Sequence, residues 1–184
     1  MNIKPIITLI VSICFGSPLT AIAGDVGGGG RLVLNLVGTG TMYESTVPDI
    51  DGDGVEDPAV CFDVDLVDGK NRQIIGTATD CLSDIVPFGD GVSLVGTSFF
   101  HLSKGTLITR GNTTVKPVVS SSVTTPAGNP ITHETAAAAT GNSILDGTRR
   151  FAGATGTVRL SGMVNLSEFP DEAFFDCLFI VDLD

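Results

Sequence analysis

Carboxylate side chains alternate along a short glycine-containing segment of the chain. Residues 49–57 read Asp-Ile-Asp-Gly-Asp-Gly-Val-Glu-Asp. The aspartates occupy the first, third, fifth and ninth positions of a calcium-binding loop, and they are Asp49, Asp51, Asp53 and Asp57. Gly54 stands at the sixth position, where the chain must turn sharply, and Val55 would add its backbone carbonyl at the seventh. Calcium binds about six to eight hard oxygen ligands, and alternate side chains on a tight loop converge on one point, so the segment predicts a structural calcium site.

This acidic loop departs from an EF-hand in two ways. The twelfth position is Val60 where an EF-hand has glutamate, and Pro48 and Pro58 bracket the loop and disfavour flanking helices. The loop therefore resembles the DxDGDGxxD calcium loops of thrombospondin type 3 and dockerin-like modules, with Glu56, Asp63 or water to complete the ligand shell. The alternative is a solvated acidic turn, but clustered carboxylates without a cation would repel one another.

General acid–base chemistry has three candidate residues. His101 follows two phenylalanines, and His133 and Glu134 are adjacent. A histidine that titrates near neutral pH is a natural proton donor or acceptor, although a single histidine in an apolar strand is more often structural. Neighbouring residues of a strand face opposite sides, so His133 and Glu134 cannot both face one cavity. No nucleophile, zinc-protease or phosphate-loop motif identifies a reaction, and catalysis is left open.

The N-terminal 23 residues read as a secretory signal peptide. Lys4 precedes an apolar run at 6–15, and residues 21–23 read Ala-Ile-Ala, a small-x-small cleavage pattern. The run is shorter than the roughly 20 residues that span a bilayer, and no later stretch is long enough; a buried first helix is the alternative. We expect a secreted or periplasmic protein without a membrane span, beginning with a flexible glycine-rich leader at 24–30.

Three cysteines remain after Cys14 leaves with the signal peptide, so the chain forms at most one intramolecular disulfide. Cys61 and Cys81 flank an apparent turn at 68–71, which places them at similar heights on adjacent strands and predicts that they pair. Cys177 alternates with apolar residues, which is typical of a buried thiol that packs as a small hydrophobe.

The elements that carry these residues read as strands. Segments rich in Val, Thr, Phe, Ile and Leu are separated by Gly, Asn, Asp and Pro, which is the pattern of an all-β protein. Strands are predicted at 31–44, 59–67, 72–82, 91–102, 106–119, 131–140, 150–166 and 173–183. Eight strands suit a single closed antiparallel barrel over residues 31–184, with a β-sandwich as the alternative. The alanines at 136–139 leave a helix as an alternative to a strand.

Alternation along two of these strands predicts their interior faces. In one strand the apolar face contains Val60, Phe62, Val64 and Leu66, opposite Cys61, Asp63 and Asp65. In the last strand it contains Phe175, Cys177, Phe179, Val181 and Leu183, opposite Asp176 and Asp182.

A glycine-rich segment resembles a family motif. Residues 146–160, DGTRRFAGATGTVRL, are similar to the G-T/S/A-G-x-F-x-G-A-x-G-x-V pattern of allene oxide cyclase and dirigent proteins, and the resemblance extends over about 91–183. It implies an eight-stranded barrel that binds small apolar or aromatic molecules and steers their cyclisation or coupling by shape, without a cofactor. Catalytic residues of these families lie in early strands that do not align with this chain, so none is transferred.

The net charge and the amino-acid composition exclude two classes of protein. The net charge of −11 argues against nucleic acid as a partner, and a chain that is 42% hydrophobic and 17% charged is not disordered. Twelve of the 21 acidic residues but only two of the ten Lys and Arg residues lie within 42–90, so the charge belongs mainly to the acidic loop and its neighbours. Two hypotheses about function follow. The first is a secreted barrel that binds a small hydrophobic molecule, and its catalytic form is a cofactor-independent cyclase or isomerase. The second is a non-catalytic, calcium-stabilised extracellular binding or structural protein. Either could form homo-oligomers.

Overall fold

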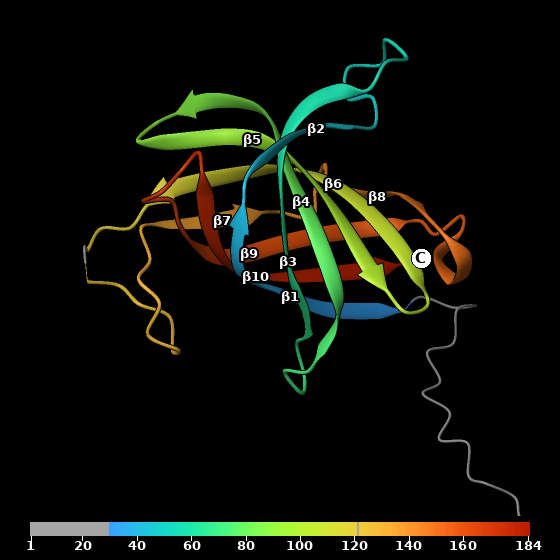
Figure 1. The fold of residues 1–184 in the computed structure, drawn as a ribbon. Coiled ribbons are helices and arrows are strands. Elements are labelled where there is room, and N and C mark those ends of the chain that lie inside the picture. The colour runs from blue at the N-terminus through green and yellow to red at the C-terminus, as the bar shows by residue number, and fades with distance from the viewer. Residues whose placement is uncertain (1–29, 121) are drawn as a thin grey trace, which may run out of the picture.

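The computed structural model describes residues 30–120 and 122–184. The predicted signal peptide at 1–23, and the leader at 24–30 except for Gly30, lie outside the described residues. The described part is almost entirely β-structure (Figure 1). Its elements are β1 (Arg31–Thr41), β2 (Tyr43–Val47), β3 (Asp57–Asp68), β4 (Ile74–Phe88), β5 (Gly91–Leu102), β6 (Gly105–Pro117), β7 (His133–Ala137), β8 (Ser143–Gly147), a 3-10 helix (Arg149–Phe151), β9 (Gly156–Asn165) and β10 (Glu172–Leu183). None of the described helices has the length and hydropathy needed to cross a membrane.

The sheet closes on itself as a barrel. Antiparallel neighbours follow the order β1-β10-β9-β7-β6-β5-β4-β3, and pairing of β1 with β3 joins the two ends. The short strands β7 and β8 share one position between β6 and β9, while β2 lies outside the ring and pairs only with β3. The predicted eight-stranded antiparallel barrel is therefore confirmed, and the β-sandwich alternative is wrong.

The strand boundaries differ from the prediction in several places. The strand predicted over 72–82 continues to Phe88 as β4, and the strand predicted over 131–140 is shortened to His133–Ala137 as β7. The strand predicted over 31–44 is divided, because the backbone N–H of Met42 bonds to Asp171 while the next residues pair with β3. The strand predicted over 150–166 begins only at Gly156, after the 3-10 turn. The strand β8 was not predicted, because five residues with a single buried side chain, that of Ile144, give little alternation. The alanines at 136–139 do not form a helix, since β7 continues to Ala137.

Alternate side chains of the strands fill the barrel. Phe62 packs against Phe175 at a ring-centroid distance of 5.0 Å, and Phe100 against Phe179 at 5.2 Å. Cys177 is fully buried among them as a free thiol, as its alternation predicts. Both predicted interior faces are confirmed, because all their members are buried except the half-buried Val60 and Leu183, whereas none of the aspartates opposite them is buried.

Candidate functional site

The barrel encloses a cavity of about 220 Å³. For scale, an engineered apolar cavity of about 150 Å³ binds benzene. The walls of the barrel cavity come from β4, β5, β6, β7, β9 and β10 and are mainly apolar. The apolar residues that line it include Leu82, Val92, Leu94, Val164, Phe175 and Phe179. The space can therefore hold an apolar molecule somewhat larger than benzene.

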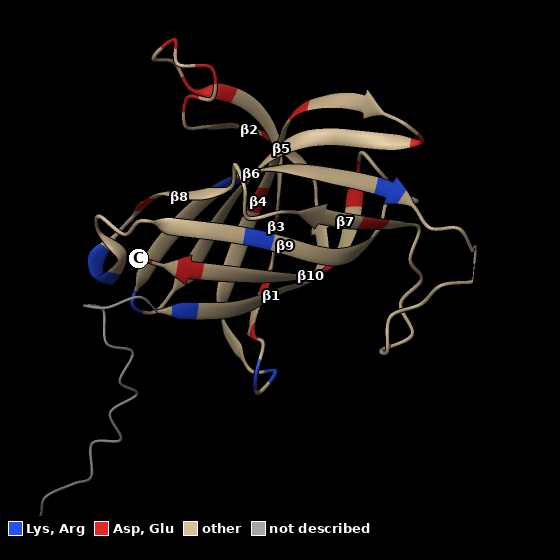
Figure 2. Cartoon of the chain, turned by 180° about the vertical axis from the view of Figure 1, so that it is seen from behind, with Lys and Arg blue, Asp and Glu red and all other residues tan. Residues whose placement is uncertain are grey.

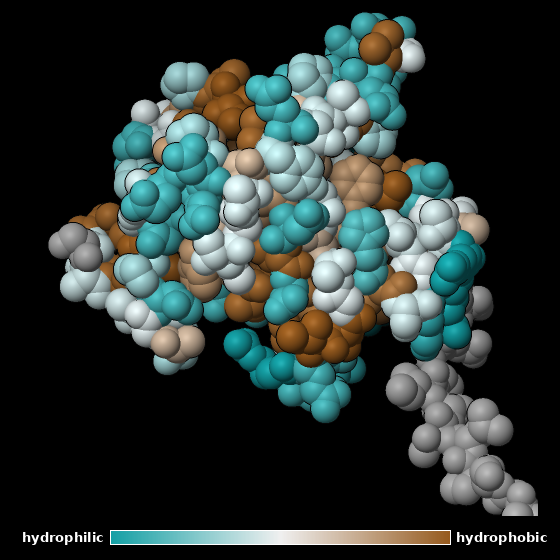
Figure 3. All heavy atoms as spheres, viewed as in Figure 1, coloured by the Kyte–Doolittle hydropathy of each residue, from teal (hydrophilic) through white to brown (hydrophobic). Residues whose placement is uncertain are grey.

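The mouth of the cavity lies beside the β4–β5 hairpin. Ile85 on this hairpin and Phe169 in the β9–β10 connection both line the cavity and are about 40% exposed, at 44% and 40%. Val86 and Phe88 extend the exposed apolar surface along the hairpin, and Figure 3 shows hydrophobic residues gathered over it. An apolar molecule that reaches this end of the barrel meets apolar side chains before it enters the interior.

A carboxyl group lies in the cavity wall. Asp80 on β4 is only 4% exposed, and its Oδ1 accepts a hydrogen bond of 2.5 Å from Ser98 on β5. Burial raises the pKa of Asp80 to about 7, and the hydrogen bond from Ser98 partly opposes that rise. Asp80 therefore changes its charge near neutral pH, which makes it a candidate acid–base group.

Reasoning from the sequence missed Asp80, although a signal was present. Cys61 and Cys81 are paired residues of β3 and β4, and the residues one step away, Phe62 and Asp80, are also paired. Paired residues of neighbouring strands share a face of the sheet, so an interior Phe62 places Asp80 in the interior as well. The predicted disulfide together with the predicted interior face was sufficient to find it.

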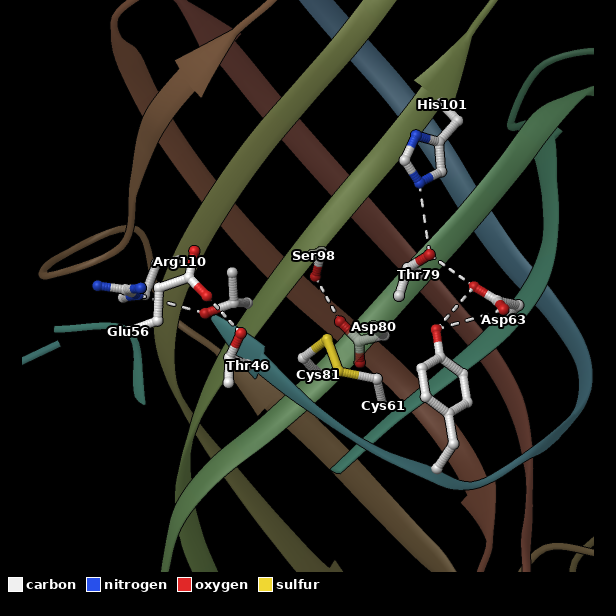
Figure 4. Close-up of a disulfide and its surroundings, with 12 residues drawn as sticks. Thr46, Glu56, Cys61, Asp63, Thr79, Asp80, Cys81, Ser98, His101 and Arg110 are labelled. Atoms are coloured by element: carbon white, nitrogen blue, oxygen red, sulfur yellow. Dashed lines mark hydrogen bonds between the residues drawn. A yellow bond between two sulfur atoms is a disulfide. The ribbon is translucent and has the colours of Figure 1, made fainter. Parts of the chain in front are cut away.

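The predicted acid–base candidates do not come together. His133 lines the cavity, with its Nδ1 2.8 Å from the Thr132 hydroxyl, whereas its neighbour Glu134 is exposed on the outside. The prediction that these two residues face opposite sides is confirmed. His101 also lies outside, where its Nε2 is 3.3 Å from the Thr79 hydroxyl, as Figure 4 shows.

The outer wall next to these residues carries the predicted disulfide. Cys61 and Cys81 are bonded directly across β3 and β4, and both are buried although they face away from the barrel interior (Figure 4). They form a small second core with Val47 and Ala59, which β2 and the start of β3 bring over the outer face. The disulfide therefore secures the wall from which the acidic loop projects.

The acidic loop connects β2 to β3, and Figure 2 shows its carboxylates on a projection from the barrel. Oxygen atoms of Asp49, Asp51 and Asp57 lie within 4.8 Å of one another. The carboxylate of Asp49 accepts backbone N–H groups from Gly52 at 2.6 Å and Gly54 at 2.7 Å, and these bonds lower its pKa.

Three of the four predicted carboxylate ligands are thus gathered on one side of the loop. The fourth, Asp53, lies outside this cluster and accepts the N–H of Val55 at 2.7 Å. Asp57 accepts the N–H of Ile50 at 2.5 Å. The gathered oxygens are hard donors of the type that calcium prefers.

An arginine from the barrel wall holds the start of the acidic loop. Arg110 on β6 donates from Nη1 to the Asp49 carbonyl at 2.7 Å, from Nη2 to the Pro48 carbonyl, and from Nε to the Thr97 hydroxyl at 3.2 Å. Burial lowers the pKa of Arg110, and the negative charges of Asp57 and Asp49 oppose that shift. Arg110 was not found from the sequence, because it is 61 residues from Asp49 and no local pattern links them.

In comparisons with known proteins, the chain matches no protein family and no curated protein sequence. The class that can be stated is a disulfide-linked, antiparallel β-barrel with an internal apolar cavity. The internal cavity and the acidic loop are the two features of this barrel that suggest a function.

Proposed function

We propose that this protein is an exported β-barrel that binds a small hydrophobic molecule inside the barrel. The observation that carries the proposal is the 220 Å³ cavity, whose mainly apolar wall contains a single acidic side chain among the described residues that line it. A disulfide between Cys61 and Cys81 agrees with an oxidising, extracytoplasmic compartment.

The catalytic form of this proposal is a cofactor-independent isomerase or cyclase. It rests on the resemblance of 146–160 to allene oxide cyclase and dirigent proteins, together with the acid–base group Asp80 in the cavity wall. An apolar wall would hold the substrate in one folded conformation, and Asp80 would supply or accept a proton. Activity then requires the same cavity as binding, so binding is tested first.

A pair of tryptophan variants on β5 tests the binding proposal. Val92 lines the cavity, whereas Val95 lies on the other face of the same strand and does not line it. Val92→Trp should fill the cavity, and Val95→Trp is the matched control. Titration with acetophenone, followed by NMR chemical shifts, should show binding to the wild type and to Val95→Trp but not to Val92→Trp. Equal binding to both variants would place the ligand elsewhere, and no binding to the wild type would refute the proposal.

The second candidate function is a non-catalytic, calcium-stabilised extracellular binding or structural protein. It is favoured by the convergence of Asp49, Asp51 and Asp57. These three carboxylates would hold the ion, with Asp53 and the Val55 carbonyl as the further predicted ligands. Like charges this close repel one another, so a bound cation would stabilise the acidic loop against the barrel.

Calcium binding has its own test. Added calcium should raise the melting temperature of the wild type, and the double variant Asp51→Ala with Asp53→Ala should lose that response. Asp84→Ala with Asp90→Ala, on the β4–β5 hairpin, is the matched control because it removes the same charge outside the acidic loop. Absence of a calcium response in the wild type would refute the site. A calcium response without acetophenone binding would favour the second function over the first.

A further inference from the structure

Asp80 is the one acidic residue among the described residues that line the cavity. Its register partners are Phe62 on β3 and Ser98 on β5, and its interior neighbours along β4 are Ala78 and Leu82. The carboxyl group thus has an apolar surrounding except on the side of Ser98. A charged group in this position lacks the water that would solvate it.

Only one of the two carboxyl oxygens of Asp80 has a protein partner. Ser98 donates to Oδ1, and Oδ2 has no hydrogen-bond partner within residues 30–120 and 122–184. Among the described residues only Ser83 Oγ is both fully buried and unpaired, so the unpaired Oδ2 of Asp80 is accessible from the cavity and can form a hydrogen bond with a molecule bound there. When the carboxyl group is protonated at Oδ2, it offers an O–H donor to that molecule.

The charges around Asp80 favour a neutral partner. The other titratable side chains of the interior, apart from the arginines, are His133 on β7, which lines the cavity, and Cys177 on β10. Burial raises the pKa of Cys177 well above its usual value, and the negative charges of Asp80 and Asp176 raise it further. Cys177 therefore stays neutral. Arg110 and Arg159 line the cavity, but their guanidinium groups bond to the acidic loop and to Asp182. No cation is directed at Asp80 by these residues.

We propose that Asp80 and Ser98 make the cavity selective for a neutral apolar molecule that carries one oxygen acceptor, such as a ketone, ester or ether. This proposal rests on the proposed binding function. The apolar wall takes the hydrocarbon part, and the Oδ2 hydroxyl of Asp80 donates to the oxygen. An anion would be repelled once Asp80 ionises. A cation would have to give up its own hydration to enter the apolar cavity, and that cost opposes its attraction to ionised Asp80.

Three probes of nearly equal shape separate these possibilities: acetophenone, its hydrocarbon isostere α-methylstyrene, and the cationic 1-phenylethylamine. Dissociation constants are measured by NMR titration of the wild type at about pH 5.5 and about pH 8.5, on either side of the transition of Asp80. At the lower pH acetophenone should bind roughly two- to tenfold more tightly than α-methylstyrene, the range of one net hydrogen bond. At the higher pH that preference should disappear, and the amine should bind no more tightly than α-methylstyrene at either pH.

Variants at the same position test the hydrogen bond itself. Asp80→Asn keeps a donor and cannot ionise, so its preference for acetophenone should persist at both pH values. Asp80→Leu removes the donor, so it should bind both neutral probes equally at both pH values. Ser98→Ala removes a hydrogen bond that favours the charged form, so the pH at which the preference is lost should rise.

The outcomes distinguish this inference from the function on which it rests. Failure of acetophenone and α-methylstyrene to bind the wild type refutes the cavity proposal, and the inference with it. Equal binding of both neutral probes at every pH leaves the cavity proposal standing and overturns the role of Asp80. Tighter binding of 1-phenylethylamine than of acetophenone at the higher pH would show that the site selects cations, which also overturns the inference.

Discussion

Replacement of Asp80 by asparagine should stabilise the protein at neutral and alkaline pH. Burial raises the pKa of Asp80 to about 7 in the folded state, from the usual aspartate value of 3.8. A shift of about three pKa units corresponds to roughly 4 kcal/mol of differential free energy between the two protonation states. Because asparagine has nearly the same shape and can still accept the hydrogen bond from Ser98, the change removes the buried charge while keeping the contact.

The direction of the pH dependence follows from proton binding. Between about pH 4 and about pH 7 the folded state holds a proton on Asp80 that the unfolded state has lost. The contribution of Asp80 to the free energy of unfolding therefore falls as the pH rises through this range, and it stays low above it. At acid pH both states are protonated, so the wild type and Asp80→Asn should have nearly equal stability.

Urea unfolding with the disulfide intact measures this difference. At about pH 8.5 the free energy of unfolding of the variant should exceed that of the wild type by roughly 4 kcal/mol, and near pH 3.5 the two should be almost equal. In thermal unfolding at about pH 8.5 the melting temperature of the variant should be about 8–16 °C higher. Other groups cancel in the comparison, including Asp49, whose lowered pKa gives the opposite dependence. A difference that does not change with pH, or a wild type that is the more stable protein at pH 8.5, would refute the buried, uncompensated carboxyl group.

Other contacts give sharp expectations. Replacing Cys61 and Cys81 together by serine should lower the free energy of unfolding by about 3 kcal/mol in urea denaturation, because the bond closes a segment of sequence separation 20; an unchanged midpoint would contradict this. Arg110→Ala removes the hydrogen bonds to the loop carbonyls, so it should speed hydrogen exchange in the acidic loop and lower the free energy of unfolding by roughly 2 kcal/mol. Unchanged exchange would show that these hydrogen bonds do not hold the loop. Gly162→Ala should lower the melting temperature and lower the free energy of unfolding by roughly 1–3 kcal/mol, because the added Cβ would lie 2.2 Å from the sulfur of Cys177. Combining Gly162→Ala with Cys177→Gly should recover part of the lost stability.

Much of the barrel could be predicted from the sequence, because strand structure depends on a local pattern. The period-two alternation in β3 and β10 identified their interior faces, and it placed Cys177 in the core. The turn at 68–71 set the pairing of Cys61 with Cys81. The pattern failed where local signals were weak. It does not indicate the short strand β8, and it predicts a strand over the glycine-rich stretch before Gly156, which contains a 3-10 turn.

The candidate site was likewise predictable from the sequence only in part. The acidic loop was visible in the sequence because its ligands are close neighbours in the chain, but the separation of Asp53 from Asp49, Asp51 and Asp57 depends on how the loop folds. The position of His101 outside the barrel and of His133 at the cavity likewise required the strand register.

The sequence by itself determined the strands, their buried faces, the disulfide and the concentration of acidic residues in one loop. These properties come from residue types at short spacings, which act through local backbone preference and burial. The tertiary structure decided the ring closure by β1 and β3, the contact of Arg110 with the acidic loop, and the cavity in which Asp80 is buried. A cavity is the space that remains when side chains from six strands meet, so its size and its one acidic group depend on distances between residues far apart in the chain.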